Sequence, residues 1–213
     1  MLPGTMQPGG ALSGVHPADL AGIVLTALLE RNGLESAQVD DVILGCVSQL
    51  GDQAMNIARQ AVLSAGFDER VPATTIDRQC GSSQQAAHFA AQGVIAGAYD
   101  VVIAGGVESM SRVPLGSSTA GGSVPDGIRR RYPEGLVNQG VSAELIADRW
   151  EIMRDELDAF AAESHRRAAE AWRRGWFDRQ VTPVLAGGSD AGAFDETVRE
   201  GTTVHALAGL SSC

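Results

Sequence analysis

A cysteine between a short apolar run and a long uncharged stretch is the feature of this sequence best suited to chemistry. Cys80 follows the apolar run 73–76, which predicts a strand, and precedes a stretch without Lys, Arg, Asp or Glu that reaches Tyr99. Charged residues are almost never fully buried unless they are paired. The uncharged stretch therefore predicts a helix buried on all sides, with Cys80 in its first turn.

The start of a helix favours an anion, because unpaired backbone N–H groups and the positive end of the helix dipole lie there. Thiols in such positions commonly have a lowered pKa and hence more thiolate, the nucleophilic form. The same N–H groups could hold the oxyanion that forms when the sulfur attacks a carbonyl carbon. The alternative is that Cys80 is a small buried apolar residue, and its position alone leaves both interpretations open.

The composition of the whole chain sets the outer bounds on function. A length of 213 residues with 44% hydrophobic residues suits a protein of one large or two modest α/β domains. The three cysteines, Cys46, Cys80 and Cys213, have no metal-ligand spacing and do not suggest a disulfide framework. Without a signal peptide or a long apolar run, a cytoplasmic location is the default expectation. The net charge of −10 disfavours nucleic acid and anionic membrane as partners, but not a small anionic ligand.

Alternating strand and helix patterns predict an α/β layer with a largely parallel sheet. The predicted helices are Ala18–Asn32, which Pro17 opens and Gly33 ends, and Asn56–Ala65, and the predicted strands are Val39–Val47, Ala73–Asp77 and Val101–Ala104. His16 is better explained as a neighbour of a helix cap than as a catalytic group.

The pattern changes near Arg112. Residues 113–137 are rich in Gly, Ser and Pro, and a loop of this length in a compact domain is usually functional. Two helices are predicted after it, over 142–150 and over 155–174 with Asp155 as N-cap, and 180–185 could form a strand. We therefore expect a core domain over 1–112 and a second domain over 113–213.

Five short segments form a series along the chain. They are Asp77-Arg78-Gln79-Cys80-Gly81-Ser82-Ser83-Gln84-Gln85-Ala86, Gly105-Gly106-Val107-Glu108-Ser109-Met110-Ser111, Gly140-Val141-Ser142-Ala143-Glu144, Arg154-Asp155-Glu156-Leu157-Asp158 and Asp195-Glu196-Thr197-Val198-Arg199. The first resembles the active-cysteine signature of the thiolases, and the second resembles their next hallmark. Any one segment is a weak signal, but five in order with the expected spacing are a strong one. The resemblance implies a thiolase N-terminal αβ core followed by an inserted helical loop domain.

The resemblance also implies an activity. Thiolases are transferases of fatty acid metabolism, including β-oxidation, and take an acyl group from acyl-CoA onto the nucleophilic cysteine, here Cys80. They then condense it with acetyl-CoA or, in the degradative direction, cleave a 3-ketoacyl-CoA with free CoA. No cofactor is held permanently, since coenzyme A thioesters are the substrates. The family resemblance implies a homodimer or homotetramer.

Substrate-binding residues are expected in the loop domain. Arg129, Arg130 and Arg131 are candidate partners for the CoA phosphates, although a solvated turn is the plainer interpretation of this run. Gln139 stands where many relatives carry an apolar residue near the acyl pocket, and it is the candidate that bears on chain length.

Several family features have no counterpart in this chain. The histidine of a Gly-His-Pro motif and the second catalytic cysteine belong to a second half, and His16, His88, His165 and His205 do not match that motif. Both ends look cut or frameshifted, so we expect a truncated form that does not turn over alone. The alternative is a non-catalytic fragment that acts only as a binding or dimerisation module.

The first strand of the family also lacks a counterpart. The resemblance, as we interpret it, places that strand in the sheet between Val39–Val47 and Val101–Ala104, which would then face a gap. Each buried unpaired backbone group costs about 1–3 kcal/mol, and a domain has a net stability of only about 5–15 kcal/mol. We therefore expect a marginal or aggregating monomer.

Overall fold

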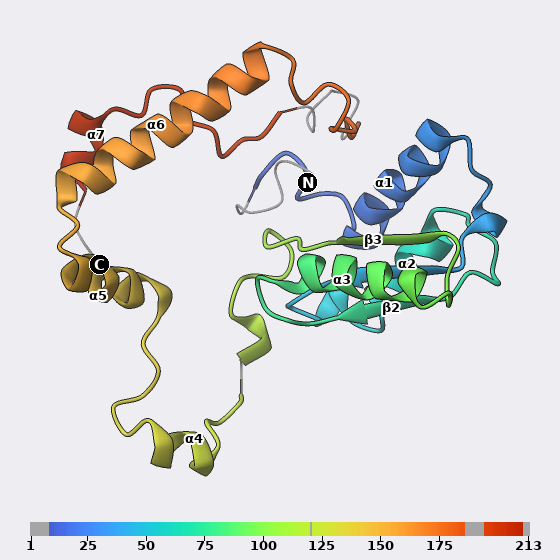
Figure 1. The fold of residues 1–213 in the computed structure, drawn as a ribbon, viewed down its shortest axis with the longest axis horizontal. Coiled ribbons are helices and arrows are strands. Elements are labelled where there is room, and N and C mark those ends of the chain that lie inside the picture. The colour runs from blue at the N-terminus through green and yellow to red at the C-terminus, as the bar shows by residue number, and fades with distance from the viewer. Residues whose placement is uncertain (1–8, 120, 186–193, 211–213) are drawn as a thin grey trace. The chain divides into compact units, whose positions relative to one another are not determined.

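The computed structural model describes residues 9–119, 121–185 and 194–210 (Figure 1). They form two compact units, and each is described by itself. The first contains the described residues up to 119 together with 180–185 and 194–196, and the second contains 121–179 with 197–210. None of the helices in these ranges combines the length and the apolar character needed to span a bilayer.

Three parallel strands form the sheet of the first unit. The central strand is β1 (Asp41–Gly45), which pairs with β2 (Ala73–Ile76) on one side and with β3 (Val102–Gly106) on the other. Each strand lies within or beside the range that the sequence pattern indicates. The predicted α/β class with a parallel sheet is thus confirmed.

The gap expected in this sheet is not there. β1 and β3 are direct neighbours, with Ile43 opposite Ala104 and Gly45 opposite Gly106. Because these two strands satisfy each other's backbone N–H and C=O groups, the cost expected from unpaired groups does not arise. The order of the three strands agrees with the resemblance, but the expected gap between β1 and β3 is wrong for this chain, and a marginal monomer no longer follows from it.

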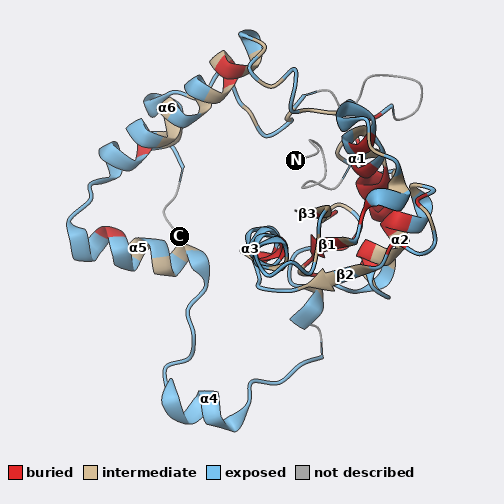
Figure 2. Ribbon diagram, turned by 45° about the vertical axis from the view of Figure 1, so that its right-hand side comes forward, coloured by how far each residue is buried: buried red, intermediate tan, exposed pale blue. Residues whose placement is uncertain are grey.

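Helices cover both faces of the sheet, α1 and α2 on one side and α3 on the other (Figure 2). Their bounds are α1 Pro17–Asn32, α2 Ile57–Ser64 and α3 Ser82–Ile95. Within β1, Val42 and Leu44 are buried in the cluster with α1 and α2, whereas Ile43 is buried with Ala86 and Ala90 of α3. Successive side chains of a strand point to opposite faces, so one short apolar strand supports both helix layers.

The ends of α1 follow from three residues. His16 is the N-cap, and its Nδ1 accepts a hydrogen bond from the Ala18 N–H at 3.2 Å. Pro17 opens the helix, and Gly33 ends it with a left-handed φ of 62°, which glycine adopts without steric cost. His16 thus serves the helix end. α2 begins after Asn56, whose side chain caps it in the same way.

The helix α3 is buried on one side only. Ser82, Gln85, Ala86 and Ala90 are its buried residues. The expectation of a helix buried on all sides is wrong for this chain, because in the part that the structure describes the sheet is what covers α3. Cys80 does not lie in the first turn either: Gly81 is the N-cap, and Cys80 precedes it.

The second unit contains the remaining α-helices of the described ranges. They are α4 (Asp126–Arg131), α5 (Gln139–Trp150), α6 (Arg154–Arg173) and α7 (Val204–Ala208). α6 starts one residue earlier than predicted, because its N-cap is Met153, whose N–H donates to the Glu156 carboxylate at 2.9 Å. Phe160 of α6 is 79% exposed.

The segment 180–185 is not a strand, contrary to its apolar pattern. It belongs to the first unit, where Val184 is 1% exposed and packs with Leu12 and Leu20. The guanidinium of Arg31 donates to a backbone carbonyl of this segment at 2.9 Å. The division expected from the sequence, 1–112 and 113–213, does not anticipate this return and stays a prediction for the domains.

Candidate active site

A tight turn connects β2 to α3 and presents Cys80. The residue before the cysteine, Gln79, has a left-handed φ of 48°. For a residue other than glycine this conformation costs on the order of 1–3 kcal/mol, and such residues cluster at functional sites. The Gln79 N–H donates to the Asp77 carboxylate at 2.6 Å. The Ser82 hydroxyl accepts from the Arg78 N–H at 2.8 Å and donates to the Gln79 carbonyl at 2.6 Å.

Cys80 is exposed on this turn and forms no disulfide. Its two following amides are engaged within the turn: the Gly81 N–H donates to the Arg78 carbonyl at 3.0 Å, and the Ser82 N–H donates to the Gln79 carbonyl at 3.0 Å. These amides are therefore not available to a ligand. The amide of Cys80 itself is left as the candidate donor to an oxyanion beside the sulfur.

Two glycines let the start of α3 approach the sheet closely. A Cβ on Gly45 would lie 2.5 Å from the Ser82 carbonyl carbon and 2.6 Å from the Ser83 nitrogen. A Cβ on Gly106 would lie 2.5 Å from the Ser83 hydroxyl oxygen. Gly45 and Gly106 are register partners at the ends of β1 and β3. The height of α3 over the sheet, and with it the place of Cys80, depends on these two positions having no side chain.

Behind the turn, Glu108 ties the ends of the strands together. Its carboxylate accepts from the Val47 N–H at 2.7 Å, from the Ser48 N–H at 3.2 Å and from the Gln53 amide at 2.9 Å. The side-chain Oε1 of Gln53 in turn accepts from the Ser109 N–H at 2.6 Å. The second hallmark segment thus has a structural role here, because it satisfies the polar groups where β1 and β3 end.

Cys46 contrasts with Cys80. It is 1% exposed, and burial together with the neighbouring Glu108 carboxylate raises the pKa of its thiol to about 12. Burial disfavours the charged thiolate, and the carboxylate repels it. Cys46 therefore stays a neutral thiol at physiological pH and packs in the core directly after β1, with Ala18 and Ile57.

The predicted substrate-binding residues all lie in the second unit. Arg129, Arg130 and Arg131 form the last turn of α4 and are exposed. The Arg129 guanidinium donates to the Val124 carbonyl at 3.1 Å. Gln139 is the exposed first residue of α5, directly after the N-cap Asn138. The roles assigned to these four residues and to Cys80 remain predictions.

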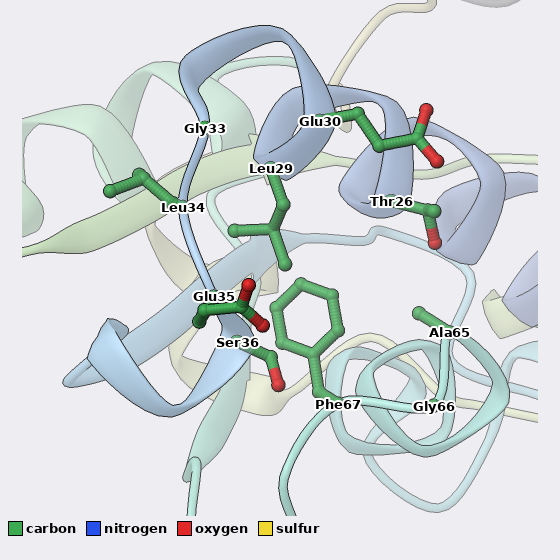
Figure 3. Close-up of a pocket in the computed structure, with 10 residues that line it drawn as sticks. All are labelled: Thr26, Leu29, Glu30, Gly33, Leu34, Glu35, Ser36, Ala65, Gly66 and Phe67. Carbon is green, nitrogen blue, oxygen red and sulfur yellow. The ribbon is translucent and has the colours of Figure 1, made fainter.

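The structure also contains a pocket in the first unit, between the ends of α1 and α2 (Figure 3). It has a volume of about 410 Å³, and Figure 3 shows Leu29 and Phe67 pointing toward one another at its centre. It contains none of the predicted site residues. Within the described ranges, no group of three or more His, Cys, Asp or Glu side chains is arranged to hold a metal ion.

Comparison with known proteins identifies the family. The family described as "Thiolase, N-terminal domain" matches residues 4–213. The chain belongs to the thiolase family. The steroid 3-ketoacyl-CoA thiolase FadA6 of Mycobacterium tuberculosis is 42% identical over 213 residues, which are 95% of this chain and 51% of that protein. A 3-ketoacyl-CoA thiolase of Escherichia coli is 40% identical over 98% of this chain and 54% of its own length.

A solved structure supports the thiolase fold. The crystal structure of the Bacillus anthracis acetyl-CoA acetyltransferase matches with a TM-score of 0.79 and 37% identity, over 97% of this chain and 55% of that one. The chain spans about half the length of the curated relatives it matches. Its thiolase resemblance, inferred from five segments, is thus shown, and these relatives bear names of acyl-transferring enzymes acting on coenzyme A thioesters.

The sequence indicated the cysteine of this thiolase turn but not the residues that shape the turn. In the sequence, Asp77, Ser82 and Glu108 are parts of the two hallmark segments, which assign no role to any of them. A signal existed for the first two, because Asp and Ser side chains commonly bond to backbone groups two or three residues away at turns. No pattern in the sequence marked Gln79 as left-handed.

Proposed function

We propose that this chain is the cysteine-bearing part of a coenzyme A-dependent thiolase, in which Cys80 accepts the acyl group. The observation that carries the proposal is the exposed Cys80 on the hydrogen-bonded turn directly before α3, where its own N–H is the candidate oxyanion donor. The names of the relatives support a substrate among the 3-ketoacyl-CoA or acetyl-CoA thioesters, and the proposal includes no permanently bound cofactor.

In the proposed step, the Cys80 sulfur attacks the thioester carbonyl carbon of acyl-CoA. A bond forms between Sγ and that carbon, the bond from the carbon to the CoA sulfur breaks, and the proton of the Cys80 thiol ends on the released CoA. Negative charge gathers on the carbonyl oxygen during the attack, which is where a backbone N–H stabilises the transition state most. In the synthetic direction the acyl group then passes to the α-carbon of acetyl-CoA, which loses a proton, and the Cys80 thiol is restored. In the degradative direction Sγ instead attacks the 3-keto carbon of a 3-ketoacyl-CoA, the bond between C2 and C3 breaks, C2 takes up the thiol proton and leaves as acetyl-CoA, and the acyl group passes from Cys80 to the sulfur of free CoA.

The second unit is proposed to be the inserted loop domain. Arg129, Arg130 and Arg131 would contact the CoA phosphates, because guanidinium groups bind phosphate oxygens strongly. Gln139 would border the acyl pocket. Replacing the three arginines by alanine should weaken binding of desulfo-CoA in calorimetry, and unchanged binding would remove them from the site. Self-association into a homodimer or homotetramer is proposed from the family and is tested by light scattering.

Mass spectrometry tests the nucleophile directly. The folded chain is incubated with acetyl-CoA, and the adduct is located by peptide mapping. This chain contains no lysine, so the amino terminus is the main amine that could be acetylated, and neutral hydroxylamine removes a thioester but not an amide. We expect a hydroxylamine-sensitive acetyl group on Cys80 that is lost in Cys80→Ala. No such adduct, or an equal one on Cys46, would refute the proposal and favour a non-catalytic binding module.

A further inference from the structure

The left-handed residue before Cys80 is held from both sides. On its amino side, the Gln79 N–H donates to Asp77 Oδ1 at 2.6 Å, and the Gln79 side-chain amide donates to Asp77 Oδ2 at 3.4 Å. On its carboxyl side, the Gln79 carbonyl accepts from both the hydroxyl and the N–H of Ser82, at 2.6 and 3.0 Å. Both peptide groups of Gln79 are therefore fixed in direction.

The Ser82 side chain can hold the Gln79 carbonyl in place, because its hydroxyl forms hydrogen bonds in both directions and the residue is buried. A hydroxyl donates one hydrogen bond and accepts others, and Ser82 uses both functions, since it also accepts from the Arg78 N–H at 2.8 Å. The residue is 5% exposed and lies against the backbone of Gly45, with no room for a side chain between them. The buried Ser82 hydroxyl thus fixes the position of the turn relative to the central strand of the sheet.

We propose that Asp77 and Ser82 are positioning residues that hold Gln79 in the left-handed conformation and thereby aim Cys80, an inference that rests on the acyl-transfer function proposed above. Neither touches the substrate. Their effect reaches the reaction through the backbone of Gln79, because the peptide group between Gln79 and Cys80 carries the N–H that faces the developing oxyanion. If that peptide group rotates, the Cys80 sulfur and the N–H no longer face the same carbonyl group of the substrate.

Two reactions of Cys80 separate positioning from general reactivity. Alkylation by iodoacetamide requires only that the sulfur is accessible and nucleophilic. Acetylation by acetyl-CoA also requires the amide to face the carbonyl oxygen. Loss of the positioning contacts should therefore lower the ratio of acetylation rate to alkylation rate, whereas loss of the fold would change both reactions together.

Matched pairs of variants isolate each contact in the full chain. Asp77→Ala and Asp77→Asn both remove the charge, but only asparagine keeps an oxygen that accepts from the Gln79 N–H. Ser82→Ala removes the buried hydroxyl, whereas Ser83→Ala makes the same change at the next residue, whose hydroxyl bonds to none of residues 77–81 in the structure. We expect the rate ratio to fall between about tenfold and a hundredfold in Asp77→Ala and in Ser82→Ala. It should change less than about threefold in the two controls.

The conformation itself gives a second readout that does not depend on activity. A left-handed residue shows a strong nuclear Overhauser effect between its own N–H and Hα, so this signal of Gln79 should weaken in Ser82→Ala. Gln79→Gly should restore the rate ratio in the Ser82→Ala background, because glycine adopts this backbone conformation without steric cost. Asp77 is exposed, so Asp77→Ala tests the contact even if Ser82→Ala does not fold.

The outcomes are distinct. An unchanged rate ratio with an unchanged Gln79 signal in both Asp77→Ala and Ser82→Ala would overturn the inference. If the wild-type chain takes no acetyl group, the proposed function fails, and the Gln79 signal alone then decides whether the two residues hold the turn. An equal fall of the rate ratio in the controls and in the test variants would also count against the positioning role.

Discussion

Replacing Gly45 by alanine should displace the start of α3 and with it the proposed nucleophile. The new Cβ would lie 2.5 Å from the Ser82 carbonyl carbon and 2.6 Å from the Ser83 nitrogen, both of which are backbone atoms that cannot rotate away. Ordinary contacts between such atoms are about 3.4 Å or longer, so the helix start must move by about 1 Å. Overpacking of this kind costs about 1–3 kcal/mol.

A shift of this size affects both stability and chemistry. For a chain of this length, each kcal/mol lowers the Tm by about 2–4 °C, which thermal unfolding followed by circular dichroism resolves. Displacing a reactive group by 1 Å can cost about a hundredfold in rate, which the acetylation of Cys80 reports.

Gly105→Ala is the matched control for this prediction. Gly105 lies beside Gly106 in β3, and its added Cβ would meet the Leu44 side chain at 3.5 Å, an ordinary contact. We expect this variant to keep the wild-type Tm within about 2 °C. If Gly45→Ala has the same Tm and the same rate of Cys80 acetylation as Gly105→Ala, close packing of α3 on β1 does not position the cysteine.

Four further predictions follow from the groups around the site and from α6. At neutral pH iodoacetamide should modify Cys80 in the native chain and Cys46 only in denaturant, and mass spectrometry of the peptides distinguishes the two. Because the pKa of Cys46 is about 12 when folded and near 9.0 when unfolded, stability should fall as the pH rises from 9 toward 12; urea titrations at rising pH should show a shallower fall in Cys46→Ala. Glu108→Ala should lower the unfolding free energy by about 2–4 kcal/mol, with Glu108→Gln between it and the wild type, because the removed carboxylate leaves several donors unpaired; equal stability of all three would contradict the network. Two arginine side chains hold the pKa of Glu163 at about 2, below its usual 4.5, so its contribution to α6 should be present above pH 4.5 and be lost as the pH falls toward 2; the effect should be small because the group is exposed, and acid titration of helicity against Glu163→Gln checks it.

Local patterns were sufficient for the elements of the first unit. The apolar run around Val42 to Leu44 predicts β1, and Pro17 with Gly33 marks both ends of α1, because backbone sterics act on each of these residues directly. The sequence also located Cys80 at the start of a helix, although the helix begins two residues later than a first-turn cysteine requires.

What the sequence did not predict depends on contacts between distant residues. β1 pairs with β3 because two particular strand edges meet. The apolar residues of the two strands are compatible with direct pairing and also with a further strand between them. The uncharged composition of α3 suggested burial, but a composition cannot say which neighbours are present to cover a helix. Likewise the sequence around Val184 has the apolar pattern of a strand, yet Val184 packs as a buried side chain against Leu12 and Leu20.

The packing of Val184 against Leu12 and Leu20 makes the first unit discontinuous along the chain, which has a consequence for synthesis on the ribosome. The strands and helices of the sheet are complete once residue 106 has emerged, but Leu12 and Leu20 stay uncovered until Val184 arrives. The intervening 78 residues (184 minus 106) take about 4–16 s at about 5–20 residues per second. During that interval a nascent chain exposes an apolar site beside α1, so ribosome-bound chains stalled before Val184 should recruit a chaperone that chains stalled after it release.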